Sequence, residues 1–478
     1  MVNSGHIISI TKDVFNLSLN MNGGEIMFSI LTALAVTLVV GYFILKKFKP
    51  QTVLFAGGIF LMILASLFHT GEILALEDQT GFWFFDIFEY IKNVFKSDSA
   101  GTGLIIMAVG GFAIYMDKIG ASSAMVSICI KPLKKINAPY LVLALSYVVG
   151  QFLNVFIPSA AGLSVLLMAT LFPVLVELGV SRLSAAALIG TAACLDLGPA
   201  SGASNMAAQT AGLDPMVYFV NYQLPVSAMV VPTISVLHYI VQKYCDKKMG
   251  FKAGEAQEDK KNTEAAPKIY AILPLLPLIF LFVFSKLIIS SISMDVITAM
   301  LLGTTIALIF ELVRKKGHAK EVFKSIQIFF DGMGHQFATI VTLIIAGEVF
   351  AKGLQAIGAI DIIIESCKAT GFGPVPMTIV MVLIITVCSI VMGSGNAPFY
   401  AFAALAPTVA AAFGVSTVLM VMPMQLASGI ARSVSPITSV IVAVSDSADL
   451  FPVDVVKRTA IPMIGGLVVL MAATFLMF

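Results

Sequence analysis

The sequence predicts an all-α polytopic membrane protein made of two inverted repeats, each with five transmembrane helices and one re-entrant hairpin, and with two unwound helices. Composition, the length of the apolar segments and an internal repeat lead to this prediction. Of the 478 residues, 58% are hydrophobic and 12% are charged, whereas soluble domains carry about 25% charged residues. A larger soluble core does not explain the deficit, but lipid-facing surface does. The net charge of +2 gives no basis for nucleic acid binding.

Ten apolar segments are long enough to cross a bilayer, which requires about 20 residues. These segments are roughly 26–45, 52–73, 102–117, 183–212, 223–243, 269–289, 294–313, 336–354, 416–445 and 458–478. Two further apolar stretches, 137–178 and 375–413, are interrupted by small residues at 158–162 and 393–397. Each of these stretches could form two spans or one re-entrant hairpin.

The distribution of charge decides between these alternatives. Basic residues cluster at 46–49, 131–135, 243–268, 314–316 and 457–458, whereas the loop 72–100 is acidic. The positive-inside rule assigns the basic clusters to the cytoplasm. This assignment requires 137–178 and 375–413 each to return to the side they entered, because counting them as full spans would put the 243–268 loop outside with its seven lysines. We therefore expect ten spans and two hairpins, both termini outside, and a multi-pass location in a bacterial cytoplasmic (inner) membrane. The aromatic, amphipathic segment 81–96 is expected on the outer interface.

Prolines and glycines recur in the same order and at nearly the same spacing in the two halves of the chain. Prolines 199, 215 and 225 recur 237 positions later at 436, 452 and 462, and glycines 120 and 179 match glycines 358 and 414. An ordered set of matches indicates homologous halves. Five spans is an odd number, so the second half would be inverted, as in many secondary transporters. The expected units are an N-terminal segment 1–25, repeats 26–243 and 268–478, and a cytoplasmic linker 244–267.

Four interruptions of the backbone fall at corresponding places in the two halves. Two are the hairpin tips, and two are Pro/Gly/Ser-rich breaks inside 183–212 and 416–445. Proline removes an amide donor, and non-helical backbone at membrane depth is tolerated where it is buried or lines a cavity. A half-helix that begins at a break offers free amides to a carboxylate. A single such motif is commonly a packing feature, but four matched motifs favour a binding site.

Arg432 is the most informative single residue, because a charge at the bilayer centre costs about 2.5–3.5 kcal/mol on insertion scales. Its guanidinium could bind a substrate carboxylate or form a structural pair with Asp196, which lies in the equivalent break. Asp196 could instead couple transport to an ion or lie outside the membrane, and Asn205 is a second ion-coupling candidate. Glu348 and Lys352 are expected to neutralise each other at i,i+4 spacing.

Two other polar residues in the apolar segments are expected to have a structural role. Gln151 and Asn154 are expected to form helix–helix hydrogen bonds. The scattered cysteines and histidines predict no disulfide framework, metal site or cofactor.

Several segments resemble the DcuC family of anaerobic C4-dicarboxylate carriers. They are 162–174, 393–402 (GSGNAPFYAF), 432–444 and 451–462. The resemblance extends over about 26–478 and implies a homodimeric scaffold in membrane lipid with a mobile transport domain that works as an elevator. It implies efflux or exchange of succinate, fumarate, malate or aspartate. Asp196 departs from the apolar residue expected at its position.

The resemblance also implies a set of substrate-binding residues. In the second half these are Ser394, Gly395, Asn396, Arg432, Ser433, Ser435, Pro436 and Thr438. The looser matches in the first half are Ser159, Ala160, Ala161, Gly162, Ser201 and Gly202.

Three other functions compete with dicarboxylate transport. An ion-coupled carrier of amino acids or peptides would use an acid at the site to bind an ammonium group. A membrane-embedded enzyme is disfavoured because the sequence has no metal or nucleophile motif. A channel would not need inverted hairpins with matched breaks. Na⁺ and H⁺ are the candidate coupling ions.

Overall fold

The computed structural model describes residues 23–46, 48–251, 267–285, 288–289, 291–292, 294–316, 318–369 and 373–478. Regular structure within these ranges is helical, with no strand, which confirms the all-α prediction. Most of the expected N-terminal segment 1–25 and of the linker 244–267 lies outside the described residues.

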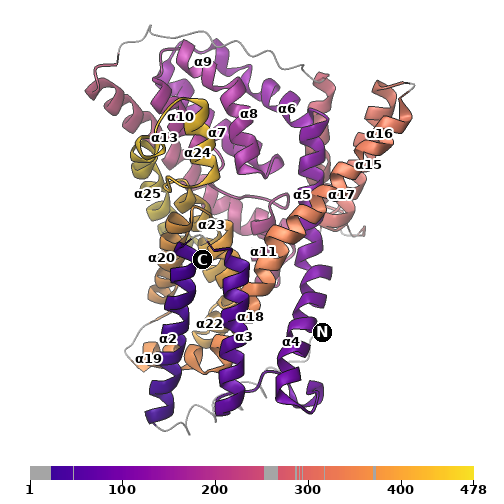
Figure 1. Ribbon diagram of the computed structural model, residues 1–478. Coiled ribbons are helices and arrows are strands. Elements are labelled where there is room, and N and C mark those ends of the chain that lie inside the picture. Colours follow the sequence, from indigo (N-terminus) through magenta and orange to yellow (C-terminus); the bar gives the residue numbers. More distant parts are fainter. Residues whose placement is uncertain are drawn as a thin grey trace.

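The first half runs from α2 to α13, in the order in which Figure 1 colours the chain. Its helices are α2 (Gly23–Leu45), α3 (Pro50–Phe68), η1 (Leu76–Asp78), α4 (Trp83–Ala100), α5 (Thr102–Lys118), α6 (Ala121–Ile130), η2 (Leu133–Lys135), α7 (Pro139–Phe156), α8 (Ala160–Thr170), α9 (Phe172–Glu177), α10 (Arg182–Thr191), α11 (Gly202–Thr210), α12 (Pro215–Tyr218), the π-helical η3 (Phe219–Gln223) and α13 (Leu224–Lys248).

The second half runs from η4 to α25. Its helices are η4 (Lys268–Leu275), α14 (Leu276–Val283), α15 (Val296–Arg314), α16 (Ala319–Ser325), α17 (Gln327–Gln336), the π-helical η5 (Phe337–Val341), α18 (Thr342–Ala356), α19 (Ala359–Ala369), α20 (Pro374–Met392), α21 (Asn396–Ala403), α22 (Ala406–Ala412), α23 (Val418–Arg432), α24 (Ser439–Ser447) and α25 (Pro452–Met477).

Matched residues of the two halves stand at matched places in the fold. Gly120 and Gly358 both adopt positive φ, 80° and 78°, directly after α5 and α18. Only glycine takes this conformation at little steric cost, so the same turn ends both helices. Pro173 and Pro407, which are 234 positions apart, form a further match, and both fall in the first turn of a short helix, α9 and α22. The element order therefore agrees with a repeat, while the inversion of the second half remains a prediction.

The number of long apolar helices is close to the expectation. Eight described helices are long and apolar enough to cross a membrane, or nine if α4 and α5, which are bent by 43°, form one span. The expected spans 183–212 and 416–445 are each divided into two helices, α10 with α11 and α23 with α24. The expected span 269–289 is shorter, because α14 ends at Val283.

Each of the two stretches predicted to be a hairpin forms a helix–tip–helix unit. The first hairpin (α7–α9) turns at 157–159, and the second hairpin (α20–α22) turns at 393–395. Their first limbs, Pro139–Phe156 and Pro374–Met392, are each long enough to cross a bilayer. In Figure 1, α9 lies at the top and α22 lies in the lower part of the molecule. Re-entry from opposite faces therefore remains a prediction.

Helix contacts divide most of the molecule into two groups. The scaffold group comprises α2–α5, α14, α15, α17 and α18, in which α3 packs on α18 and α5 packs on both α15 and α17. The hairpin group comprises α7, α8, α10, α11, α13, α20, α21 and α23–α25. The two groups meet mainly where α18 contacts α21 and where α5 contacts α11, and α2 also touches α20.

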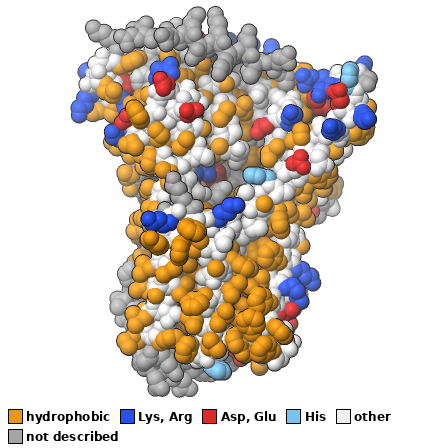
Figure 2. All heavy atoms as spheres, viewed as in Figure 1, with side chains coloured by type: hydrophobic (Ala, Val, Ile, Leu, Met, Phe, Trp, Pro, Cys, Tyr) orange, Lys and Arg blue, Asp and Glu red, His pale blue; other side chains and the backbone are white. Residues whose placement is uncertain are grey.

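The surface shows how apolar and charged side chains are separated. Figure 2 shows apolar side chains over most of the lower face, where Figure 1 places α2 and α3, and charged side chains toward the upper end. Apolar exposure of this extent is expected where lipid replaces water.

Candidate functional site

The break between α10 and α11 is an irregular, buried segment. All residues from 191 to 201 are buried. Gly198 has φ of +80°, and Pro199 follows it. Ser201 caps α11 by accepting a hydrogen bond from the Ser204 amide at 3.3 Å. The sequence thus ends one helix and begins another inside the protein, as predicted.

Side-chain amides form hydrogen bonds with backbone groups of this break that lack a helical partner. Gln151 Nε2 and Asn154 Nδ2, both on α7, donate to the Leu195 carbonyl at 3.1 and 2.7 Å. Gln151 Oε1 also accepts from the Leu195 amide at 3.1 Å. The expectation that Gln151 and Asn154 bond between helices is therefore wrong in detail, because their partner is the unwound segment.

A second pair of glutamines holds the next residue of the break. Gln425 Nε2 on α23 donates to the Asp196 carbonyl at 2.8 Å, and Gln223 Nε2 donates to Gln425 Oε1 at 2.8 Å. Gln223 Oε1 accepts from the Gly198 amide at 3.0 Å, and the Tyr218 hydroxyl donates to Gln425 Oε1 at 3.3 Å. Sequence reasoning missed these three side chains. Glutamines are rare in apolar spans, and this rarity was the feature of the sequence that could have drawn attention to Gln223 and Gln425.

Arg432, the last residue of α23, reaches across to the first break. Its Nη2 donates to the Ala193 carbonyl at 2.7 Å and to Asp196 Oδ1 at 3.1 Å. Both side chains are buried, with Arg432 8% exposed and Asp196 5% exposed. The pairing of these two residues, one alternative raised by the sequence, is present in the structure. It joins the two repeat-equivalent breaks through a charge-assisted hydrogen bond.

The tip of the second hairpin packs against the same region. A Cβ added at Gly395 would lie 2.7 Å from the Ser428 carbonyl and 3.2 Å from Arg432 Cδ. A Cβ added at Gly393 would lie 2.7 Å from the side chain of Ile437, in the second break. Glycine therefore allows this tip to approach Arg432. Ser394 Oγ accepts from the Ala397 amide at 3.3 Å, and Asn396 begins α21.

The second break contributes buried hydroxyl groups. Ser433 Oγ donates to the Gly429 carbonyl at 3.2 Å, and Thr438 is the N-cap residue of α24. Ser435 is buried, and its Oγ has no hydrogen-bond partner among the described residues. Pro436, the residue after Ser435, is half-buried.

The first hairpin tip has different surroundings. Ser159 is exposed and caps α8 by accepting from the Gly162 amide at 3.1 Å, and Ala160 and Ala161 lie in that first turn. A Cβ added at Gly162 would lie 3.6 Å from Asp117 Oδ2 of α5. The first tip thus adjoins an acid, whereas the second tip adjoins a guanidinium.

The remaining candidates lie on α11. A Cβ added at Gly202 would lie 3.1 Å from the Tyr400 hydroxyl of the second hairpin. Asn205 Nδ2 donates to the carbonyls of Pro199 and Ser201, both at 2.8 Å, so it holds the break in shape. The Oδ1 of Asn205 and the Oδ2 of Asp196 are buried and have no partner among the described residues.

Two features favour an anion at this centre. Helices α11, α21 and α24 begin at the first break, the second tip and the second break, and each N-terminus carries about half a positive charge. Arg432 adds a full positive charge beside the second tip. Asp196 offsets that charge in the structure as it stands.

The expected pairing of Glu348 with Lys352 is wrong. Lys352 Nζ lies 5.7 Å from the centre of the Tyr90 ring, and the described residues contain no ion pair between Glu348 and Lys352. Spacing alone placed both residues on one face, but the aromatic ring offers the ammonium another partner.

Comparisons with known proteins bear on what this arrangement does. Residues 28–478 match the model of the C4-dicarboxylate anaerobic carrier family, DcuC. The chain is 35% identical over 451 residues to the probable anaerobic C4-dicarboxylate transporter DcuC of Vibrio cholerae serotype O1, with 94% of this chain and 98% of that protein covered. It is 36% identical over 448 residues to the anaerobic C4-dicarboxylate transporter DcuC of Escherichia coli (strain K12), with coverage of 94% and 96%.

Solved structures share the fold at low sequence identity. The YdaH transporter of Alcanivorax borkumensis matches with a TM-score of 0.58 and 14% identity, over 89% of this chain and 98% of that chain. MtrF of Neisseria gonorrhoeae, from a class of antimetabolite efflux pumps, matches with a TM-score of 0.55 and 13% identity, over 89% and 94%. These similarities concern the fold alone.

Proposed function

The chain belongs to the DcuC family of C4-dicarboxylate anaerobic carriers, and from this premise we propose that it moves C4-dicarboxylates such as succinate, fumarate, malate and aspartate by an elevator-type mechanism. Members of this family are transporters and not enzymes, and the multiple apolar helices make this chain a multi-pass membrane protein. Efflux or exchange across a bacterial inner membrane, in a homodimer, completes the proposal.

One observation carries the proposed site: the side chain of Arg432 contacts the glycine of the second hairpin tip. The distance of 3.2 Å from Arg432 Cδ to an added Cβ at Gly395 puts the guanidinium stem against the tip. A substrate carboxylate between the tip amides and Arg432 would gain bidentate, charge-assisted hydrogen bonds. The hydroxyl groups of Ser433, Ser435 and Thr438 would bind the rest of the substrate.

In this proposal the substrate competes with Asp196 for the guanidinium. Arg432 is already paired and only 8% exposed, so binding requires the Arg432–Asp196 contact to open. The competition keeps the positive charge compensated both with and without substrate. Asp196 then acts as the carboxylate that occupies Arg432 in the empty carrier.

The division into two helix groups supports an elevator. Both breaks and both hairpin tips belong to the hairpin group, and the scaffold group meets it at α18–α21 and α5–α11. Movement of the hairpin group as a body would carry the intact site past the scaffold. Alternating access of this kind needs no rearrangement of the site itself.

The alternative amino-acid or peptide carrier lacks a specific observation in its favour. Asp196, the acid in the first break, is paired with Arg432 through Oδ1 in the structure, so no described contact favours an ammonium group over a carboxylate at the breaks. Dicarboxylates therefore remain the proposed substrates.

Counterflow in proteoliposomes tests the substrate class. Vesicles loaded with unlabelled succinate should accumulate labelled succinate, fumarate and aspartate, but not labelled arginine. Accumulation of arginine, or of none of the dicarboxylates by monodisperse protein, would contradict the proposal. Protein-free vesicles provide the baseline.

A further inference from the structure

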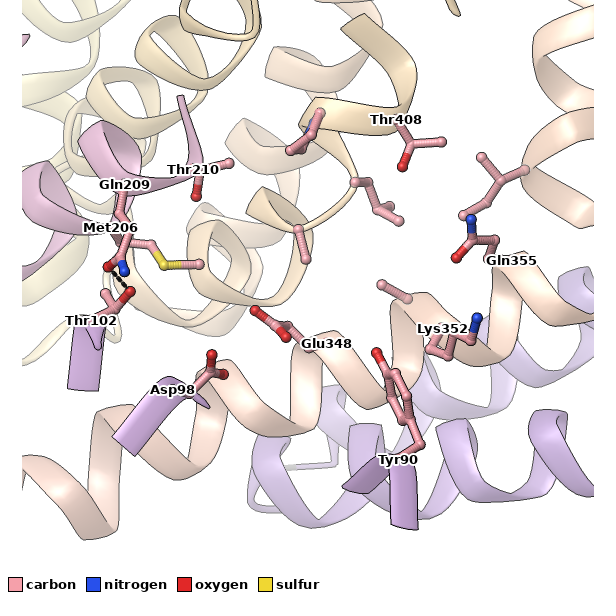
Figure 3. A pocket seen from close by; sticks show the side chains of 15 residues that line it. Tyr90, Asp98, Thr102, Met206, Gln209, Thr210, Glu348, Lys352, Gln355 and Thr408 are labelled. Carbon is pink, nitrogen blue, oxygen red and sulfur yellow. Dashed lines mark hydrogen bonds between the residues drawn. The ribbon is translucent and has the colours of Figure 1, made fainter. Parts of the chain in front are cut away.

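A second polar site lies away from the breaks, in a cavity of about 350 Å³ between the two helix groups. The scaffold side is formed by α4 and α18, and the hairpin side by α11, the α21–α22 turn and α22, while α5 and α19 contribute one lining residue each. Figure 3 shows the Asp98 and Glu348 carboxylates turned toward each other in this cavity, with Lys352 on the other side of Glu348.

The two acids stand at the contact between the helix groups. Gly347, next to Glu348, packs so closely on the second hairpin that an added Cβ would lie 2.8 Å from Ala401 Cα. Thr102, at the start of α5 and near Asp98, donates a hydrogen bond to Gln209 of α11. Any sliding of the hairpin group past the scaffold would therefore open or close this cavity.

The cavity is lined by two acidic side chains, Asp98 and Glu348, and one basic side chain, Lys352. Asp98 Oδ2 is a buried atom without a hydrogen-bond partner among the described residues. Asp98 and Glu348 are close enough to interact electrostatically, and both side chains are partly buried. Lys352, the nearby cation, is held over the Tyr90 ring at 5.7 Å.

The other lining elements do not supply a compensating charge. From α4 the cavity receives Tyr90 in addition to Asp98, and from α18 it receives Lys352 and Gln355. The lining residues from α5, α11, α19 and the second hairpin are uncharged. Two adjacent carboxylates in a partly desolvated site disfavour double ionisation, and one proton between them removes the repulsion.

We propose that Asp98 and Glu348 form a proton-carrying pair that couples dicarboxylate movement to the proton gradient. This inference rests on the proposed transport function and adds the identity of the coupling ion and its site. While the cavity is open to water on one side of the membrane, one carboxylate takes a proton from that water. When the cavity closes, the protonated acid donates a hydrogen bond to the other carboxylate. When the hairpin group moves and the cavity opens to water on the other side, both carboxylates become hydrated and the proton leaves to that water.

The test compares net transport with exchange in proteoliposomes. Glu348→Gln and Asp98→Asn should lower succinate uptake driven by an imposed pH gradient by about tenfold or more. Succinate counterflow at equal pH on both sides should stay within about twofold of the unmodified protein, because exchange needs no net proton release. Asp331→Asn is the matched control, since it removes an exposed carboxylate of α17 that accepts a hydrogen bond from Gln327 and lies outside the cavity lining.

The outcomes separate this inference from the proposed function. Absence of dicarboxylate counterflow in the unmodified protein would overturn the transport function itself. Normal counterflow together with an unchanged response to the pH gradient in both variants would overturn the proton pair alone. A response to a sodium gradient but not to a pH gradient would also overturn it. Each variant is assayed only as a monodisperse protein, and Glu348→Asp, which keeps the acid, should retain coupling.

Discussion

Removal of the Arg432 charge tests the structure and the proposed site at once. Arg432→Ala leaves the Asp196 carboxylate buried without a counter-charge, because Oδ1 loses its donor at 3.1 Å and Oδ2 already has none among the described residues. The Ala193 carbonyl also loses its donor at 2.7 Å. Breaking a buried ion pair from one side costs about 3–5 kcal/mol.

The second variant in this experiment removes both charges. Asp196→Asn combined with Arg432→Ala leaves no uncompensated ion at either position. The double variant should therefore recover about 2 kcal/mol or more of the summed cost of the two single substitutions. Thermal unfolding in detergent, followed for all four forms, gives this coupling free energy.

Substrate affinity answers a different question with the same four proteins. If Arg432 binds a substrate carboxylate, the double variant should bind succinate more weakly than the unmodified protein even though it regains stability. Loss of the charge-assisted contact should cost about 1.5–3 kcal/mol, a loss in affinity of about tenfold to 150-fold. Arg432→Lys should fail nearly as badly, because an ammonium lacks the planar fork. A double variant that binds succinate as tightly as the unmodified protein would make Arg432 a purely structural charge.

Three further predictions concern the shape of the site and the topology. Gln425→Leu removes the donor to the Asp196 carbonyl at 2.8 Å and should lower the free energy of unfolding by about 1–3 kcal/mol, measured by thermal unfolding. Gly395→Ala should abolish counterflow while the protein stays folded, because the new methyl group would lie 2.7 Å from the Ser428 carbonyl and displace the tip. Met249→Cys, at an exposed position just after α13 and within the expected cytoplasmic linker, should react with an impermeant thiol reagent only from the inside of the membrane.

Each of these predictions has a matched control in the same chain. Gln327→Leu removes an exposed glutamine of α17 and should leave stability unchanged, whereas an equal loss for both glutamines would contradict the role of Gln425. Gly334→Ala adds a methyl group where nothing lies within 4 Å, and it should transport normally. Leu76→Cys, in the acidic loop, should react from the outside. Labelling of both cysteines from the same side would refute the predicted topology.

The sequence was sufficient to predict the helical membrane fold and the places where helices are interrupted. Runs of apolar residues determine where a helix can meet lipid, and Pro, Gly and Ser clusters determine where it cannot continue. Both signals are local, so the breaks near Pro199 and Pro436 and the tips near Pro158 and Gly393 appear in the structure where they were expected.

Contacts between distant helices were harder to predict from the sequence. The partner of Arg432 could be suggested because Asp196 occupies the repeat-equivalent break. The partners of Gln223 and Gln425 could not be predicted, since a glutamine in an apolar helix does not indicate which carbonyl it will bind. The same limit explains the error at Lys352, because spacing on one helix contains no information about the Tyr90 ring of another.

The acid at position 196 has a physical role under the proposed function. A carrier that returns empty would move an uncompensated Arg432 through a low-dielectric region, and such a buried charge is costly. Asp196 supplies a carboxylate at 3.1 Å that compensates the guanidinium in place of substrate. An apolar residue at this position would leave the charge compensated only while substrate is bound, which suits strict exchange. The presence of Asp196 therefore favours a carrier able to return empty, which is what net efflux requires.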